Sequence, residues 1–125
     1  MIARAVLSCL LGAVLVCAAS AIARADGDPA KGEDIYKRCQ GCHSIDRNRI
    51  GPMHKGLFGR TAGTVTGFTY SDAMKNSGIE WNDDTLGRFL RDPKGALPGN
   101  RMAFPGIKDD EELADLLAYL KQATQ

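Results

Sequence analysis

Two cysteines separated by two residues and followed directly by a histidine constrain this chain more than any other feature. They form the run Cys39-Gln40-Gly41-Cys42-His43. Thiols at this spacing can form thioether bonds to the two vinyl groups of a haem, and the adjacent imidazole can then reach the iron. The run therefore predicts one haem c, bound covalently through Cys39 and Cys42, with His43 as an axial ligand.

The first 25 residues have the pattern of a secretory signal peptide. Residues 1–4 carry one positive side chain, residues 5–23 contain no charge, and Ala23-Arg24-Ala25 is an A-x-A cleavage pattern. We expect export to the periplasm with cleavage after Ala25, which leaves residues 26–125 as one domain. The alternative is an uncleaved membrane anchor, because the apolar stretch approaches the length that spans a bilayer.

Export would change both the cysteine content and the charge of the chain. Cys9 and Cys17 lie in the segment that would be removed, so haem attachment would use every remaining thiol. Loss of Arg4 and Arg24 leaves 14 Lys and Arg against 15 Asp and Glu, a net charge of −1. This balance argues against a general nucleic-acid binder, which needs a strongly basic surface.

Helical spacing and capping signals predict an all-α fold with short helices and long loops. Helices are expected from Asp28-Pro29 toward Cys39, over 71–77, over 82–92 and after Asp109, where Glu112 would complete a capping box. The last helix carries an apolar stripe, formed by Leu113, Leu116, Leu117 and Leu120 and widened by Tyr119. Residues 44–67 have no sustained period and predict a loop, and loops this long are expected to wrap a cofactor.

The second ligand of the iron must come from elsewhere in the chain, and four side chains could supply it: Met53, His54, Met74 and Met102. Met102 lies between Pro98 and Pro105, in an irregular segment that can hold a soft thioether in place. His54 is its rival, because imidazole also binds haem iron. However, His54 lies close to His43 in sequence and would have to reach the opposite face of the haem.

Several motifs together resemble those of class I c-type cytochromes, the group of cytochrome c2 and mitochondrial cytochrome c. They are the run at 39–43, Gly51-Pro52, 56–60, 67–70, Gly78-Ile79 with Trp81, Pro98-Gly99 with Met102 and Phe104, and 114–120. The resemblance covers residues 26–125. It implies the cytochrome c fold, a small single domain wrapped around one haem, with His43 and Met102 as axial ligands.

The resemblance also implies roles for residues around the haem. The Pro52 carbonyl would orient His43, and Phe104 would screen the haem edge. Arg60, Tyr70 and Trp81 would hold a buried propionate, although composition alone favours Tyr70 and Trp81 as core aromatics. Gly32 and Tyr36 would pack against Tyr119. Four residues depart from the family pattern and leave the reduction potential open. They are His54 where the family usually has an apolar residue, Met74 where it often has a polar one, Phe89 where tyrosine is common and Asn100 where threonine is common.

An iron with both axial positions filled cannot easily bind oxygen or substrate, so we expect a soluble, monomeric one-electron carrier and not an enzyme. Its partners would be redox proteins: a membrane cytochrome complex, a terminal oxidase, a photosynthetic reaction centre or a periplasmic dehydrogenase. Basic residues would surround the haem edge, with the acidic run 109–112 elsewhere; the basic set is Lys37, Arg38, Lys94 and Arg101.

Two other classes of function stay open at this point. A haem enzyme or ligand sensor would result if Met102 detached from the iron. A thiol or zinc site could use Cys39 and Cys42, but the chain lacks the second Cys/His pair of a closed zinc site.

Overall fold

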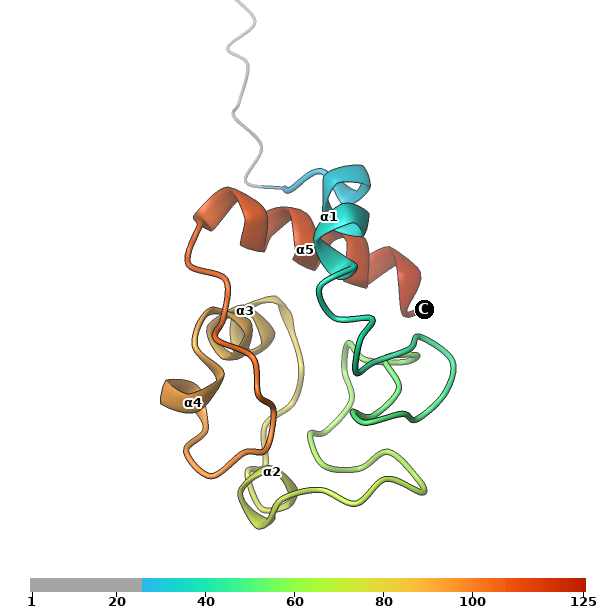
Figure 1. Cartoon of the computed structure of the whole chain (residues 1–125), viewed down its shortest axis with the longest axis vertical. Coiled ribbons are helices and arrows are strands. Elements are labelled where there is room, and N and C mark those ends of the chain that lie inside the picture. Colours follow the sequence, from blue (N-terminus) through green and yellow to red (C-terminus); the bar gives the residue numbers. More distant parts are fainter. Residues whose placement is uncertain (1–25) are drawn as a thin grey trace, which may run out of the picture.

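The computed structural model describes residues 26–125 as five short helices joined by long loops (Figure 1). The helices are α1 (Pro29–Tyr36), α2 (Asp72–Lys75), α3 (Asp83–Arg91), α4 (Pro93–Ala96) and α5 (Asp110–Ala123). Within this range the only strand-like pairing is an isolated bridge between Thr61 and Glu80. The all-α prediction is therefore confirmed. The predicted signal peptide lies outside the described residues.

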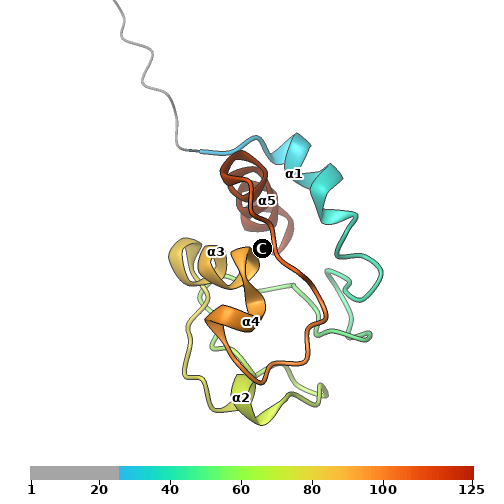
Figure 2. The ribbon, with the colours of Figure 1, turned by 60° about the vertical axis from the view of Figure 1, so that its left-hand side comes forward.

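The first and last helices cross each other, as Figures 1 and 2 show. Asp28 caps α1 by accepting a hydrogen bond from the Ala30 N–H at 2.9 Å, and Pro29 occupies the first turn. A side chain at Gly32 would overlap the backbone of Asp115 in α5, so glycine allows the close approach. The Tyr36 ring lies 5.3 Å from the Tyr119 ring. The predicted packing of α1 on α5 is confirmed.

The start of α5 differs in one respect from the prediction. Asp109 accepts a hydrogen bond from the Glu112 N–H at 2.8 Å, as an N-cap should. The Glu112 carboxylate does not return to the cap, however, because it accepts two hydrogen bonds from the Arg38 guanidinium at 2.8 and 3.0 Å. The capping-box prediction was therefore wrong in its second half, and a contact between helices replaces a local one.

The central helices follow their capping residues. Ser71 caps α2, which is shorter than the predicted 71–77, and Asn82 caps α3 in a reciprocal capping box with Thr85. Asp92 ends α3 as predicted. It also caps the one-turn helix α4 by accepting a hydrogen bond from Gly95 N–H at 3.1 Å, and this helix was not predicted.

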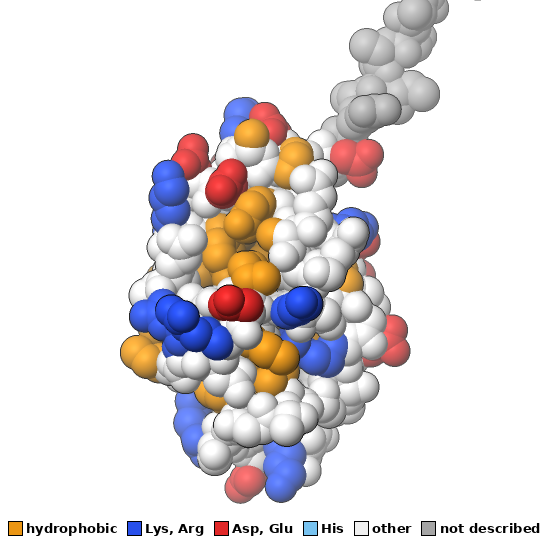
Figure 3. Space-filling view, turned by 90° about the vertical axis from the view of Figure 1, so that its right-hand side faces the viewer, with side chains coloured by type: hydrophobic (Ala, Val, Ile, Leu, Met, Phe, Trp, Pro, Cys, Tyr) orange, Lys and Arg blue, Asp and Glu red, His pale blue; other side chains and the backbone are white. Residues whose placement is uncertain are grey.

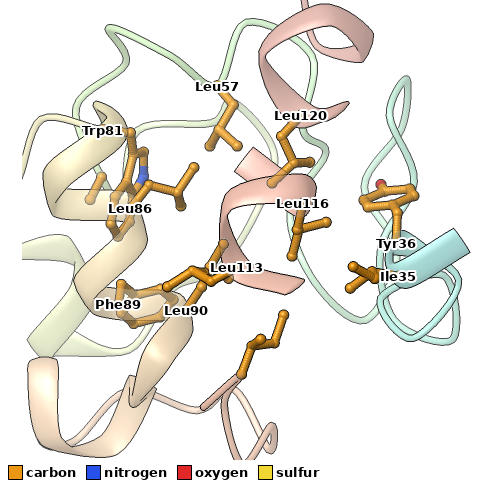
Figure 4. Packing of buried hydrophobic residues seen from close by; sticks show 12 residues of the cluster. Ile35, Tyr36, Leu57, Trp81, Leu86, Phe89, Leu90, Leu113, Leu116 and Leu120 are labelled. Atoms are coloured by element: carbon orange, nitrogen blue, oxygen red, sulfur yellow. The ribbon is translucent and has the colours of Figure 1, made fainter. Parts of the chain in front are cut away.

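The buried apolar residues form one cluster, to which α1, α3, α5 and the loops between them contribute (Figure 4). The predicted stripe of α5 supplies Leu113, Leu116 and Leu120, whereas Leu117 is only partly buried. Trp81 and Phe89 face them from the other side, with ring centroids 5.2 Å apart. No helix in 26–125 has both the length and the apolar content needed to cross a membrane. The cluster borders the cavity described next.

Candidate functional site

The cysteine–histidine run leaves α1 through a series of tight turns. The Cys39 N–H donates to the Tyr36 carbonyl at 2.8 Å, and the N–H groups of Cys42 and His43 both donate to the Cys39 carbonyl, at 3.1 and 2.9 Å. Both thiols are free. Burial raises the pKa of the Cys39 thiol to about 11, so it is not poised as a reactive thiolate. Cys39 therefore does not resemble the low-pKa thiol of a redox-active dithiol.

A loop then turns back and brings residue 54 beside residue 43. The Gly51 N–H donates to the Cys42 carbonyl at 2.8 Å, and the His54 N–H donates to the Ser44 carbonyl at 3.0 Å. A side chain at Gly51 would overlap three atoms of the His43 ring, so the loop can close only with glycine at this position. These contacts fix the loop without any helix or strand.

The His43 imidazole has one nitrogen occupied and one available. Its Nδ1–H donates to the Pro52 carbonyl at 2.9 Å, the hydrogen bond that the resemblance implied. Burial lowers the pKa of this imidazole, and the Pro52 carbonyl partly opposes the shift. A neutral ring with Nδ1 donating has its lone pair on Nε2, which is the form that binds metals.

His43 lies on the wall of a cavity of about 340 Å³, within the size range of ligand pockets of roughly 300–1,000 Å³. The wall is mainly apolar, with contributions from the cluster described above. All the residues predicted to hold a haem lie on this wall: Cys39, Cys42, His43, Pro52, Arg60, Tyr70, Trp81, Met102 and Phe104. A large apolar wall with two free thiols and an available imidazole fits a covalently attached haem.

Arg60 gives this wall a positive charge. Its guanidinium donates to the carbonyls of Lys55 and Met53 at 3.0 and 3.1 Å, and no carboxylate in 26–125 lies within ion-pair distance of it. Burial lowers the pKa of this guanidinium. Since a half-buried charge without a counter-ion is costly, an anionic group of the ligand would suit this position. A haem propionate is such a group.

Tyr70 and Trp81 differ in how they are held. The Tyr70 hydroxyl accepts a hydrogen bond from the Val65 N–H at 3.2 Å, whereas Trp81 is buried against Phe89. Both line the cavity, so neither is only a core aromatic.

The Met102 loop is fastened by Asn100, which the sequence identified as a departure from the family pattern but not as a tether of Met102. Asn100 Nδ2 donates to the carbonyls of Pro93 and Leu97, both at 2.8 Å, and Asn100 Oδ1 accepts from the Met102 N–H at 2.8 Å. The departure from the family's threonine therefore leaves a side chain that ties Met102 to α4. Only the position of Asn100 in an irregular, proline-bounded segment could have suggested this.

The other candidate ligands are placed differently. The His54 ring stacks on His43, with centroids 4.2 Å apart and an angle of 23° between the planes. It therefore lies beside His43 and not opposite it, and this placement does not favour His54 as the second axial ligand. Met74 lines the cavity, but Met53 does not.

The predicted separation of charge is also only partly correct. Lys37 pairs with Asp34 at 2.6 Å, and Arg38 pairs with Glu112 of the acidic run at 2.8 Å. Arg38 lines the cavity, so one acidic residue reaches its rim. Figure 3 shows apolar side chains gathered on one face, with basic and acidic side chains around them. The expectation that the acidic run lies apart from the basic residues is therefore wrong for Arg38.

Within 26–125, no group of three or more His, Cys, Asp or Glu side chains could hold a metal ion. A zinc site built on Cys39 and Cys42 therefore lacks the further ligands that it needs.

Comparisons with known proteins agree with this site. The family model for cytochrome c matches residues 29–124. The chain is similar to cytochrome c2 of Blastochloris viridis, with 47% identity over 90% of this chain and 91% of the relative. It is also similar to cytochrome c2 of Rhodomicrobium vannielii, with 43% identity over 98% and 97% of the two chains.

A solved structure supports the fold. Cytochrome cH from Methylobacterium extorquens has a TM-score of 0.74 and 44% identity, covering 76% of this chain and 98% of its own. Members of this family carry electrons on a haem c bound covalently through two cysteines, which here are Cys39 and Cys42. The chain belongs to the cytochrome c family and is a class I c-type cytochrome.

Proposed function

We propose that His43 Nε2 and Met102 Sδ are the two axial ligands of the haem iron, and that the protein is a one-electron carrier without catalytic activity. The observation that supports this most is that the available nitrogen of His43 and the tethered Met102 belong to the same cavity. When bound, the haem supplies the Fe(III)/Fe(II) couple. Ligation by His and Met is one of the arrangements found in cytochromes c and favours a high potential.

The other wall residues would position the haem. Arg60 would bind a propionate with the help of Tyr70 and Trp81, because its charge has no carboxylate partner. Phe104 would cover the haem edge and limit access of water. The Pro52 carbonyl would hold His43 in the tautomer that binds iron.

The alternative is a haem enzyme or sensor in which Met102 leaves the iron and a substrate or gas takes its place. The three hydrogen bonds of Asn100 oppose such a release. Two measurements on the purified holoprotein separate the candidates. A carrier gives a reversible one-electron redox titration and no carbon monoxide binding by the reduced protein at neutral pH. Rapid carbon monoxide binding would favour the sensor or enzyme.

We further propose export to the periplasm, with residues 1–25 removed as a signal peptide, and a soluble monomer that docks transiently on other redox proteins. The bacterial cytochrome c2 relatives support this location. Cell fractionation with N-terminal sequencing of the holoprotein tests it. A periplasmic protein that begins at Asp26 is expected, and a membrane-bound chain that retains residues 1–25 would refute the proposal.

The remaining basic rim would steer docking. Lys94 and Arg101 have no carboxylate partner among the described residues, in contrast to Lys37 and Arg38. Only clustered charge steers association, and salt screens it. The rate of electron transfer to an acidic redox partner should therefore fall steeply with added salt. A rate that does not depend on salt would exclude steering.

A further inference from the structure

His54 and Tyr36 form a polar pair beside the His43 ring. The Tyr36 hydroxyl and His54 Nδ1 are hydrogen-bonded at 3.0 Å, and the His54 ring stacks on His43 with centroids 4.2 Å apart. All three side chains line the cavity. The resemblance predicts an apolar residue at position 54, so this pair needs its own explanation.

The pair is held firmly from both sides. The backbone of His54 is fixed by hydrogen bonds from its N–H to the Ser44 carbonyl and from the Leu57 N–H to its carbonyl, both at 3.0 Å. Tyr36 is only 1% exposed and packs against Tyr119 where α1 crosses α5. The His54 ring therefore has little freedom to turn away from His43.

The Pro52 carbonyl cannot fix the His43 ring completely by itself. A hydrogen bond to Nδ1 sets the direction of one ring atom, but it still allows the ring plane to tilt about that bond. Contact with the face of a second ring restricts this tilt, because stacked aromatic rings keep a preferred offset geometry. The orientation of an axial imidazole plane influences how the unpaired electron of oxidised haem is distributed over the porphyrin. Residues around a metal ligand tune the metal in this manner.

We propose that His54, pinned by the Tyr36 hydroxyl, is a positioning residue that fixes the ring plane of His43 and thereby tunes the haem iron. This inference rests on the proposed role of His43 as an axial ligand. It gives Tyr36 a second function besides packing α1 on α5. Its action on the iron is indirect, through the ring of His43.

The test uses the oxidised holoprotein and its paramagnetic proton NMR spectrum, in which the shifts of the haem methyl groups report the orientation of the axial imidazole. His54→Leu removes the stacked ring and should change the order or spread of the methyl shifts. Tyr36→Phe keeps the packing but loses the hydroxyl, and should change them in the same direction by less. The double variant should match His54→Leu alone, because Tyr36 acts through His54.

Tyr119→Phe is the matched control. It removes a neighbouring hydroxyl that makes no hydrogen bond to His54, so the methyl shifts should stay as in the wild type. The equilibrium constant for reduction of the haem should also change by up to about tenfold in His54→Leu. A tenfold change corresponds to a shift of about 59 mV in the reduction potential of a one-electron couple. A purely structural role would lower the free energy of unfolding and leave both readouts unchanged.

Wild-type methyl shifts in His54→Leu would overturn the proposal, and so would full additivity of the two single substitutions. If His54→Leu does not accumulate as holoprotein, Tyr36→Phe decides the question by the same spectrum. The wild-type optical spectrum separates failure of this inference from failure of His/Met ligation. If Met102 does not bind the iron, the methionine–iron charge-transfer band is absent from the wild type itself. If only this inference fails, the wild type shows the band.

Discussion

Replacing Asn100 with alanine should loosen Met102 from the iron without disturbing the rest of the cavity. The side chain makes three hydrogen bonds of 2.8 Å, two to the carbonyls at the start and at the C-cap of α4 and one to the Met102 N–H. Each contributes about 0.5–1.5 kcal/mol net. If opening of the loop breaks only the bond to Met102, the loss of about 1 kcal/mol makes opening about fivefold easier in Asn100→Ala. If it breaks all three, the loss of about 3 kcal/mol makes opening about 100-fold easier.

Binding of imidazole to the oxidised holoprotein measures this opening directly. Imidazole can enter only when Met102 leaves, so its apparent affinity is proportional to the open fraction. We expect the affinity for imidazole to rise by about fivefold to 100-fold in Asn100→Ala. Asn76→Ala is the control, because Asn76 is exposed at the end of α2 and its side chain makes no hydrogen bond in the described part of the chain. That substitution should change the affinity by less than about twofold.

One result would refute this reasoning. If Asn100→Ala lowers the free energy of unfolding but binds imidazole with wild-type affinity, the three hydrogen bonds stabilise the fold without restraining Met102. The imidazole affinity of Asn100→Thr should lie between those of the wild type and Asn100→Ala, since the threonine hydroxyl can replace one of the three hydrogen bonds but not all of them.

Three further perturbations test other parts of the site. Burial lowers the pKa of His54 from 6.5 to about 3. Above pH 6.5, His54 is neutral in both the folded and the unfolded chain, so the lowered pKa does not affect stability. Below pH 6.5, His54 binds a proton in the unfolded chain but stays neutral in the folded one. The free energy of unfolding should therefore fall by about 1.4 kcal/mol per pH unit below pH 6.5, a loss of about 3 kcal/mol near pH 4.5. In urea titrations, His54→Leu should flatten this pH dependence. An unchanged slope in His54→Leu would contradict the role of His54 in it. Gly51→Ala would overlap the His43 ring and should cost about 1–3 kcal/mol in the same titrations, whereas a neutral effect would show that the loop adjusts freely. Glu112→Gln frees Arg38 from an exposed ion pair and should change the free energy of unfolding by less than about 1 kcal/mol. Association with an acidic redox partner at low salt, measured by stopped flow, should become faster. An unchanged association rate would place Arg38 outside the docking surface.

Local signals in the sequence predicted much of the fold. Asp28, Asn82 and Asp109 act on the backbone within three residues of themselves, so their caps could be predicted without knowing the tertiary structure. The stripe of α5 was predictable for the same reason, because helical spacing alone places its leucines on one face. The haem run needed only the chemistry of two thiols and one imidazole at fixed spacing.

Contacts between distant parts of the chain could not be predicted in this manner. Glu112 was expected to close its own capping box, but Arg38, 74 residues away in sequence, competes for its carboxylate. His54 was considered as a ligand from the opposite face, and only the closure of the loop back to Ser44 places it beside His43. Asn100 was recognised as a departure, yet its three partners become neighbours only when α4 forms.

The most direct test of the central claim is the optical spectrum of the oxidised and reduced holoprotein. With His43 and Met102 on the iron, the oxidised wild type should show a methionine–iron charge-transfer band. Met102→Ala should abolish this band, and Met74→Leu, at the other methionine on the cavity wall, should retain it. A wild-type spectrum without the band, or a band that survives Met102→Ala, would contradict ligation by Met102 and the electron-carrier function derived from it.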